Sequence, residues 1–503
     1  MANPQKLVAE GQTAFREGRL PEALDLFLQA SRKLPQDPGI WHMLGILHSM
    51  TGNADAAEAS CRRVIALQPN SHTAYNNLGT ILKNKGQPSA AIACYRKALE
   101  IAPGYANAAN NLATLLRETG DRDEALAHYR NAVRLQPDYA EAYSNLGALL
   151  QDMGDLAGAL QAYQQAVRLQ PDSALWLFNL GCGLREAGKF EDSARAFQQS
   201  LQRDQNSART WDGLCHVQLE LRRFEDACQS GLRALQLEPD LVEACLHTAA
   251  AHQASGRTAA AIELYRRALE IDPGNETARY FLAVMGVMET PDRSPADYVR
   301  KLFDGYAETF DEALVNKLEY RTPALLFDLA RQHFQPDRDK LDIIDLGCGT
   351  GLCGTLFRPL AKQLVGVDLA PKMIQKARER AVYDTLLVDD LTPPLLASPA
   401  AYDLVLAADV FVYIGDLWPV FAATTAALRP GGHFLFSTEK AEAGQAIVLR
   451  DSGRYAHSKD YISELAARAG FEMISSDDVF LRKDGGKDIR GMLYNLRRPA
   501  AGS

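Results

Sequence analysis

A period of 34 residues in the first half of the chain constrains the fold more than any other feature of the sequence. Proline, glycine and alanine each recur at this step, with single exceptions at Gln205, Arg222 and Ser193. A fixed period of this length indicates stacked units, each burying an apolar face against its neighbours. The prolines are residues 35, 69, 103, 137, 171, 239 and 273, the glycines 18, 52, 86, 120, 154, 188 and 256, and the alanines 23, 57, 91, 125, 159, 227 and 261.

The sequence pattern within each unit predicts two antiparallel helices joined by a short turn. The recurring glycine can adopt the left-handed conformation that ends the first helix. In three units the next residue, Asn53, Asp121 or Asp155, can cap the second helix. The recurring alanine lets the two helices approach closely, and the proline ends the second helix. We expect the gap between the helices to be filled by an aromatic ring, from Phe27, Tyr95, Tyr129, Tyr163, Phe197 and Tyr265.

The eight units, assigned to residues 1–275, resemble the tetratricopeptide repeat. The resemblance implies an all-α, right-handed superhelix whose first helices line a concave face that binds a protein or peptide partner. After Pro273, an amphipathic stretch predicts a capping helix, and two further prolines predict a linker. We assign the capping helix and the linker together to residues 276–292.

Asparagine precedes the recurring leucine in four units, at Asn77, Asn111, Asn145 and Asn179. A side-chain amide can both donate to and accept from a peptide backbone. The series resembles the asparagine ladder in the repeat half of O-GlcNAc transferases, which holds extended peptides, and this implies that the four residues bind the partner. The alternative is that they form hydrogen bonds only within or between the repeats.

From about residue 340 the pattern changes to short apolar strands that alternate with helix-length segments. This alternation predicts an α/β domain with a parallel, doubly wound sheet, and the last two strands predict an antiparallel pair at its edge. We assign this domain to residues 293–503. The expected strands are 341–346, 363–369, 385–389, 402–408, 433–439, 471–483 and 489–498.

The first expected strand runs into the sequence Asp-Leu-Gly-Cys-Gly-Thr-Gly, residues 345–351. Such glycines let the backbone approach a ligand closely. A dinucleotide fingerprint is excluded because position 352 is leucine, and a phosphate-binding loop is excluded because no Lys-Ser or Lys-Thr follows. The pattern resembles motif I of class I S-adenosylmethionine-dependent methyltransferases, which have a Rossmann-like domain. The resemblance implies S-adenosylmethionine as cofactor, with contacts from Asp345, Gly347, Cys348, Gly349 and Gly351.

Further matches follow at the spacing of that family. Asp368 ends the second expected strand, where the resemblance implies that it binds the ribose hydroxyls, and Leu369 and Met373 resemble the apolar residues around the adenine. Asp389 or, preferably, Asp390 matches the acid that accepts from the adenine amino group. For each aspartate, a helix cap or a solvated turn is the alternative. Residues 402–410 match the fourth-strand motif and residues 428–436 the Pro-Gly-Gly hairpin.

Residues 296–314 predict an amphipathic helix pair, which in this family folds over the cofactor. Tyr298, Phe303 and Tyr306 are expected either to shield the sulfonium or to be core aromatics. As a whole, the second half is similar to bacterial methyltransferases that carry tetratricopeptide repeats. It is more distantly similar to small-molecule methyltransferases of the trans-aconitate type.

Methyl transfer is an in-line displacement at a carbon activated by positive sulfur, so the protein chiefly aligns the acceptor and excludes water. A base is needed only where the acceptor must lose a proton. Segments after the fourth and fifth strands face the acceptor in such a fold. They supply the predicted catalytic residues Asp409, Tyr413 and His457, of which Asp409 or His457 is the candidate base, and Arg454, which could pair with a carboxylate.

Composition narrows the remaining classes. The 503 residues are 47% hydrophobic and 23% charged, as in soluble globular proteins, and no apolar run is long enough to span a membrane. Eight cysteines without a Cys-x-x-Cys motif predict neither a metal site nor disulfides. The net charge of −9 disfavours a nucleic-acid-binding surface. No secretory signal is visible, so we expect a cytoplasmic protein.

Together these observations predict an S-adenosylmethionine-dependent methyltransferase whose repeats bind a protein or peptide that is, or carries, the methyl acceptor. One alternative is a small-molecule methyltransferase whose repeats only locate it within a complex. Another is a non-enzymatic repeat scaffold with a cofactor-sensing domain. A nicotinamide-dependent dehydrogenase fits less well because of Leu352. The acceptor atom and the oligomeric state stay open at this stage.

Overall fold

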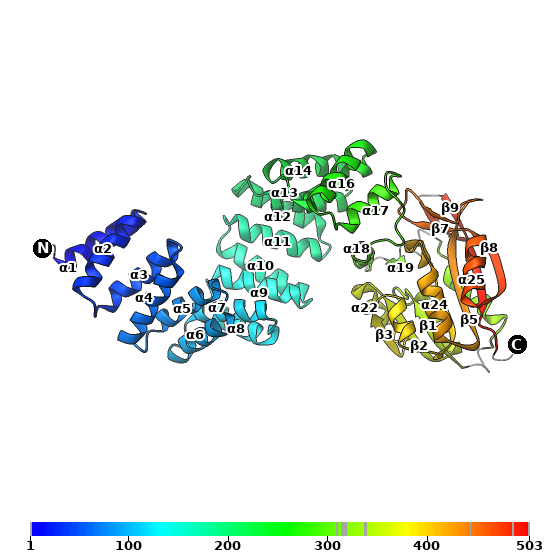
Figure 1. Cartoon of the computed structure of the whole chain (residues 1–503), viewed down its shortest axis with the longest axis horizontal. Helices are drawn as coiled ribbons and strands as arrows, with labels where there is room; N and C mark the ends of the chain where they lie inside the picture. Colours follow the sequence, from blue (N-terminus) through cyan, green and yellow to red (C-terminus); the bar gives the residue numbers. More distant parts are fainter. Residues whose placement is uncertain are drawn as a thin grey trace. The chain divides into compact units, whose positions relative to one another are not determined.

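The computed structural model describes residues 3–307, 310–312, 319–335, 340–442, 444–484 and 487–500. The chain divides into two compact units, Met1–Pro239 and Asp240–Ser503, and Figure 1 colours both along the sequence. The first unit contains seven of the eight expected repeats. The second contains the eighth repeat together with the α/β domain. Residues 308–309 and 313–314 of the expected helix pair lie outside the described residues.

Antiparallel helix pairs follow one another through the first unit (Figure 1). This confirms the predicted all-α repeat architecture. The helices are α1 (Pro4–Arg16), α2 (Leu20–Lys33), α3 (Pro38–Met50), α4 (Ala54–Leu67), α5 (His72–Asn84), α6 (Pro88–Ile101), α7 (Ala106–Thr119), α8 (Arg122–Leu135), α9 (Ala140–Asp152), α10 (Leu156–Leu169), α11 (Ala174–Glu186), α12 (Phe190–Arg203), α13 (Ala208–Glu220) and α14 (Phe224–Leu237).

The turn after each first helix has the conformation that its glycine predicts. Every glycine of the periodic series has a positive φ, and Arg222, the exception in that series, adopts φ 58° in the same place. Asn53 and Asp155 cap the following helices by accepting from the backbone N–H groups of Ala56 and Gly158. The third predicted cap is wrong, because Asp121 makes no side-chain capping hydrogen bond.

Aromatic rings fill the space between paired helices, as expected. A Cβ atom added to Gly79 would lie 2.7 Å from the Tyr95 ring, and one added to Gly181 would lie 2.7 Å from the Phe197 ring. The rings therefore occupy the place of a side chain on the first helix. Ser193, the exception in the alanine series, is buried and donates to the backbone carbonyl of Gly181 at 2.6 Å.

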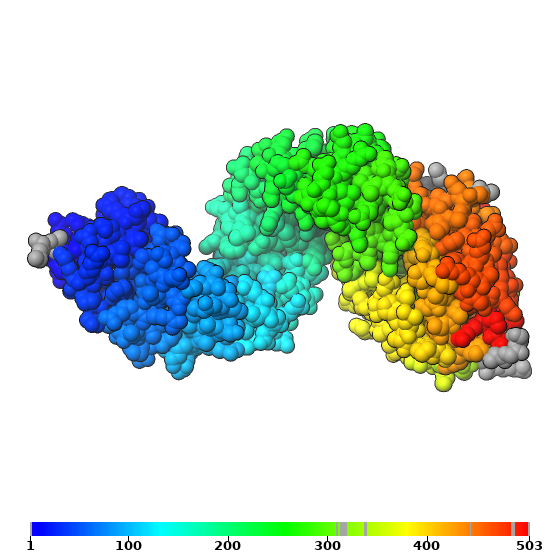
Figure 2. Space-filling model, in the orientation of Figure 1, coloured from blue at the N-terminus to red at the C-terminus, as the bar shows by residue number. Residues whose placement is uncertain are grey.

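The second unit begins with the eighth helix pair, α15 (Val242–Ala254) and α16 (Thr258–Ile271), and the capping helix α17 (Glu276–Val284). From α17, Phe281 stacks on Tyr265 of α16, with ring centroids 5.4 Å apart. Tyr280 and Val284 pack with Tyr455 of the α/β domain. Figure 2 shows these parts of the second unit in contact, in green and orange. This packing explains why the compact unit starts at Asp240, and the division at residues 276–292 stays a prediction about where the repeat pattern ends.

Five parallel strands form the sheet of the α/β domain in the order β3-β2-β1-β4-β5, and β9 adds to β5 antiparallel, with β8 outside it. This confirms the predicted doubly wound sheet with an antiparallel pair at its edge. The strands are β1 (Leu341–Leu346), β2 (Ala361–Asp368), β3 (Thr385–Val388), β4 (Tyr402–Ala407), β5 (Leu428–Lys440), β6 (Ile447–Leu449), β7 (Tyr455–His457), β8 (Glu472–Asp484) and β9 (Lys487–Arg497).

Helices cover both faces of this sheet. One apolar core lies between the sheet and α23 (Thr392–Leu396), α24 (Trp418–Ala427) and α25 (Lys459–Ala469). Another lies between the opposite face and α20 (Thr322–Arg331) and α21 (Leu352–Phe357). The helices α18 (Ala296–Tyr306), α19 (Phe310–Glu312) and α22 (Pro371–Glu379) contribute to a smaller cluster at the edge of the domain.

Two features of the sheet differ from the expectation. The fifth strand starts at Leu428, not at residue 433, because Leu428 already pairs with Tyr402, and a register shift absorbs the intervening glycines. The short strands β6 and β7 were not expected. They form a hairpin that pairs with the last two residues of β5, and each is too short for a periodic pattern to reveal.

Candidate functional site

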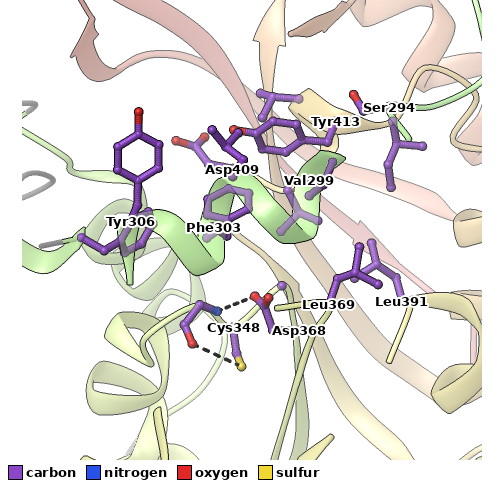
Figure 3. A pocket seen from close by; sticks show the side chains of 18 of the residues that line it. Ser294, Val299, Phe303, Tyr306, Cys348, Asp368, Leu369, Leu391, Asp409 and Tyr413 are labelled. Carbon is purple, nitrogen blue, oxygen red and sulfur yellow. Dashed lines mark hydrogen bonds between the residues drawn. The ribbon is translucent and has the colours of Figure 1, made fainter. Parts of the chain in front are cut away.

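A cavity of about 490 Å³ opens at the carboxyl ends of β1, β2 and β4. In Figure 3, α18 crosses it, with Asp368 and Cys348 on one side and Asp409 and Tyr413 on the other. Parallel α/β sheets bind their ligands at this edge. We call its two parts the glycine side, formed by Gly347, Cys348, Gly349, Asp368, Leu369, Asp389 and Asp390, and the arginine side, formed by Asp409, Tyr413, Ser452, Gly453, Arg454 and Arg482.

The loop after β1 forms a close-packed wall of the glycine side. Gly347, Gly349 and Gly351 all have positive φ. A Cβ atom on Gly347 would lie 2.4 Å from Val410, and one on Gly351 would lie 3.1 Å from the Tyr383 ring. Gly347 and Gly349 line the cavity, as does Cys348, whereas Gly351 packs behind the loop. Val410 and Tyr383 therefore leave room only for backbone, and not for side chains, at Gly347 and Gly351.

Asp368 joins the end of β2 to this loop. Its carboxylate accepts from the backbone N–H groups of Gly349 and Ala370, both at 2.9 Å, and Figure 3 shows it at the cavity wall. Burial raises the pKa of Asp368 to about 6, although these N–H groups lower it. Asp345 lies deeper, 1% exposed, and accepts from the Tyr383 hydroxyl at 2.6 Å. Burial raises its pKa to about 7.

Asp389 and Asp390 both line the cavity beyond the end of β3. One oxygen of Asp390 accepts from the N–H of Leu391 at 2.7 Å, and the other pairs with Arg293 at 2.6 Å. Asp389 accepts from the N–H of Asp390 at 2.8 Å. A ligand amino group at Asp390 would therefore share that carboxylate with Arg293, which directly follows the linker.

Two predicted apolar contacts have different positions. Leu369 lines the cavity, half-buried. Met373 is fully buried in α22, where it packs with Phe303 and Phe310, and it is not among the described residues that line the cavity. The sequence places it one helical turn after the cavity wall, so it supports the aromatic residues that form that wall.

The segment before the sheet covers the cavity, as the resemblance implies. Tyr298, Phe303 and Tyr306 from α18 line it, and Figure 3 shows Phe303 and Tyr306 projecting from that helix. The segment is tied to the glycine loop through Asp311 of α19, which accepts from the Thr350 hydroxyl and pairs with Arg380. The ring of Phe303 meets Tyr413 edge-on, with centroids 5.3 Å apart.

Buried charges support the arginine side. Arg482 of β8 is 4% exposed and pairs with Asp409 at 2.6 Å and with Glu439 of β5. Burial alone would lower the pKa of Arg482, but the two carboxylates raise it above its ordinary value. Glu439 also pairs with Arg450 at 2.9 Å and lies 3.9 Å from Arg454. No motif indicated Arg482, and the only signal available was a charged residue in an apolar strand pattern.

Asp409 and Tyr413, two of the predicted catalytic residues, line the cavity. Asp409 has a φ of 55°, which is rare for a residue other than glycine. Its two oxygens accept from Ser437 at 3.0 Å and from Arg482. Tyr413 lies beside Arg454, and burial raises its pKa, although the guanidinium lowers it. Hydrogen bonds from Ser437 and Arg482 therefore hold the Asp409 carboxylate at the cavity wall in spite of this rare backbone conformation.

His457, the third predicted catalytic residue, lies in β7 and is not among the described residues that line the cavity. It is fully buried, and its Nε2 lies 3.0 Å from the backbone carbonyl of Gly415. Burial lowers its pKa to about 4. The sequence could not reveal this position, because it depends on the β6–β7 hairpin.

The four predicted partner-binding asparagines lie in the first unit and are all half-buried. Asn111 donates to Asn76 and Asn145 donates to Asn110, both at 3.0 Å, and Asn179 donates to the Ser144 hydroxyl at 2.9 Å. Asn77 accepts from Asn76 at 3.4 Å. Bonds between repeats, the alternative weighed above, therefore exist. Each donating amide has a second N–H and a carbonyl oxygen beyond these bonds.

The glycine side fits S-adenosylmethionine on structural grounds. A side chain at position 347 would collide with Val410, so only glycine lets the loop pack this closely beside the cavity. The buried carboxylate of Asp368 lies at the cavity wall. The surrounding wall is aromatic and apolar, which suits an adenosine and a sulfonium. In the described part of the chain, no group of three or more histidine, cysteine or acidic side chains could hold a metal ion. Within the same residues, none of the helices has the length and apolar character that crossing a membrane requires.

Family models match both parts of the chain. A model described as "Methyltransferase domain" matches residues 344–434. Models described as "Tetratricopeptide repeat" match residues 14–80, 70–138, 104–172, 138–206, 178–242 and 242–285. The matched segments agree with the helix pairs and with the first five strands of the sheet.

Curated relatives match the second half. A ubiquinone biosynthesis O-methyltransferase of Bordetella bronchiseptica is 33% identical over 168 residues, which cover 30% of this chain and 66% of the relative. A malonyl-[acyl-carrier protein] O-methyltransferase of Serratia marcescens is 33% identical over 120 residues, which cover 23% of this chain and 47% of the relative. The chain thus spans about two thirds or less of these relatives. Among solved structures, PilF of Pseudomonas aeruginosa is 22% identical with a TM-score of 0.38, covering 41% of this chain and 94% of that one.

Proposed function

We propose, from the premise that this chain is a tetratricopeptide-repeat protein with a class I methyltransferase domain, that it methylates an oxygen atom of an acceptor bound at the arginine side. The observation that carries this proposal is that one cavity contains both the glycine loop with Asp368 and a wall of arginine and tyrosine side chains. A cofactor at the glycine side and an acceptor at the arginine side would therefore share one cavity.

The described residues supply the parts that binding S-adenosylmethionine requires. The Gly347–Gly351 loop leaves room for close approach, Asp368 offers oxygens to the ribose hydroxyls, and Leu369 with Asp389 or Asp390 adjoins the place expected for the adenine. When bound, the cofactor supplies an electrophilic methyl group. The aromatic residues of α18 cover this region and would exclude water from it.

Oxygen is the acceptor atom that the wall favours. Arg454 and Tyr413 can donate to a carboxylate or a hydroxyl, whereas an ammonium would lie against guanidinium groups. The relatives named above are O-methyltransferases. For a carboxylate, no base is needed, and Asp409 then serves to orient Arg482. For a hydroxyl, Asp409 and Tyr413 are the candidates at the wall, and His457 would act only through intervening groups.

Calorimetry tests the cofactor part of the proposal. The full chain should bind S-adenosylhomocysteine, and Asp368→Ala should weaken binding about a hundredfold, because two charge-assisted hydrogen bonds are lost at ~1.5 kcal/mol each. Asp477→Ala, an exposed change on β8, is the control and should leave the affinity unchanged. No binding to the unchanged protein would refute the proposal.

The repeats, in this proposal, bind a protein or peptide that is or carries the acceptor. Full chains with and without alanine at Asn77, Asn111, Asn145 and Asn179 are incubated with radiolabelled S-adenosylmethionine and lysate. Loss of protein-bound label in the variant supports recruitment through the asparagines. If label appears in small molecules equally from both chains, the repeats serve assembly, which is the second candidate function. A loss of helical signal in the variant's circular dichroism would mean that the inter-repeat bonds dominate, and the recruitment proposal would fail.

A further inference from the structure

The helix that ends the repeats reaches the arginine side of the cavity. Tyr280 in α17 is 1% exposed. Its hydroxyl accepts from the Ser294 hydroxyl at 3.1 Å and donates to the backbone carbonyl of Gly453. Gly453 lies 173 residues away along the chain and lines the cavity. A tyrosine that belongs to the capping helix thus contacts the wall directly.

The turn that Tyr280 contacts is short, and Arg450 at its start pairs with Glu439 and donates to the backbone carbonyl of Lys440. The turn joins β6 to β7. Within it the N–H of Gly453 donates to the backbone carbonyl of Arg450 at 2.8 Å, and the N–H of Arg450 donates to the backbone carbonyl of Arg454 at 2.9 Å. Gly453 has a φ of 71°, and a Cβ atom there would lie 3.2 Å from the Tyr280 hydroxyl. The close approach of the hydroxyl therefore requires glycine in the turn.

The linker after α17 holds the opposite part of the same wall. The N–H of Ser294 donates to the carbonyl of Tyr413 at 2.9 Å, and the N–H of Gly415 donates to the backbone carbonyl of Asp292 at 2.7 Å. The Tyr455 hydroxyl donates to the carbonyl of Pro291 at 2.8 Å. Ser294 therefore bonds both to Tyr280 and to the backbone of Tyr413, so that one short segment contacts both parts of this wall.

We infer that Tyr280 is a positioning residue for the methyl acceptor, because it fixes the turn that places Arg454 beside Tyr413. The inference rests on the proposed function only in taking the arginine side as the place where the acceptor binds. The contacts of Tyr280 do not depend on it.

The described hydrogen bonds of Asp368 on the glycine side come from Gly349 and Ala370 and do not involve Tyr280. Arg293, which directly precedes Tyr280's partner Ser294 in the chain, contributes the ion pair with Asp390. Loss of Tyr280 should therefore loosen acceptor binding and leave cofactor binding intact.

Hydrogen exchange on the full chain tests this inference. Tyr280→Phe keeps the ring and removes the hydroxyl that holds Gly453. We expect the exchange of the Arg450 and Gly453 amides to rise about tenfold, which corresponds to one buried hydrogen bond. Ser294→Ala removes the donor to Tyr280 and should raise the same rates by a smaller factor, about threefold. Tyr265→Phe is the matched control, since Tyr265 is also buried but bonds to Gln253.

Cofactor affinity is measured beside the exchange. S-adenosylhomocysteine should bind wild type and Tyr280→Phe with affinities that agree within about twofold, which a general loosening of the domain would not allow. Unchanged exchange at Arg450 and Gly453 in Tyr280→Phe would overturn the inference, as would an equal rise in Tyr265→Phe. If wild type failed to bind S-adenosylhomocysteine, the proposed function would fail, and the exchange rates would still decide whether Tyr280 holds the turn.

Discussion

The two units of this chain treat charge in opposite ways. In the first unit, the buried polar side chains among the described residues are all uncharged and belong to serine, threonine, asparagine and glutamine. In the second, Asp345, Glu439 and Arg482 are buried. The repeats place charge on the surface, as in the Arg117–Asp152 pair between neighbours, and bury alanine and aromatic rings.

This difference follows from what each unit has to do. A repeat is stabilised by its neighbours, so it has no reason to remove a charge from water. A catalytic cavity must hold fixed charges where a substrate displaces water, and each buried charge costs free energy unless it is paired. The first unit therefore avoids the free-energy cost of buried charge, whereas the second accepts that cost in order to hold charged side chains in fixed positions.

Removing a buried cation should have the largest effect. Arg482→Met leaves Asp409 and Glu439 buried without their shared partner, and we expect the free energy of unfolding of the second unit to fall by about 3 to 5 kcal/mol. Arg117→Met in the repeats removes a partly exposed pair and should cost less than about 1 kcal/mol. Scanning calorimetry of the full chains measures both, and similar losses would contradict the comparison.

Acid should weaken cofactor binding at the glycine side. The pKa is raised from 3.8 to about 6 in Asp368 and to about 7 in Asp345, so the folded protein keeps these protons at pH values where the unfolded chain has lost them. Stability therefore falls as the pH rises from 3.8 to these raised values, and the loss disappears in stronger acid. Binding has the opposite sign, because protonated Asp368 loses an acceptor oxygen. We expect the affinity for S-adenosylhomocysteine to fall up to about tenfold per pH unit below pH 6.

Titration by calorimetry between pH 5 and pH 8 checks this expectation. The Asp368→Asn variant is the control, because it keeps one acceptor oxygen and cannot be protonated in this range. Its weaker binding should be nearly independent of pH. If wild type and variant showed the same dependence, Asp368 would not be the responsible group.

A stabilising change in the repeats should have the smallest effect. Arg222 adopts a φ of 58° where the other first helices end in glycine. Arg222→Gly should raise the free energy of unfolding of the first unit by about 1 kcal/mol, because glycine has no steric penalty in this conformation. Thermal unfolding of the full chain measures the change. Arg223→Gly, with a φ of −90°, should not stabilise, and a gain there would contradict the reason given.

The sequence predicted the repeats almost completely because each periodic signal recurs in seven of the eight units. Arg222 shows the strength of this averaging, since the turn keeps its conformation without its glycine. The error at Asp121 is local, because the helix begins where expected and only the side-chain capping hydrogen bond is missing. The asparagines show the limit of periodicity, which predicts their alignment but not whether their amides face a neighbour or a ligand.

In the second unit, the sequence indicates residues that directly follow a strand end, and it does not indicate residues that reach the cavity through pairing between distant segments. Asp368 and the glycine loop, both indicated by motifs, line the cavity. Arg482 belongs to β8, which reaches the cavity only through the antiparallel addition of β9 to β5. His457 lies in the β6–β7 hairpin, which no local sequence pattern predicts. Such partners are set by tertiary contacts between segments far apart along the chain.

The contact between Tyr280 and Gly453 also restricts how this protein can exchange its parts by recombination. A gene fusion that joined new repeats at residue 292 would keep every methyltransferase motif and separate the tyrosine from its turn. A junction before Asp240 would carry the last helix pair, the capping helix and the linker along as one inherited block. The transferable piece is thus longer than the enzyme motif, and its first helices belong to the repeat pattern.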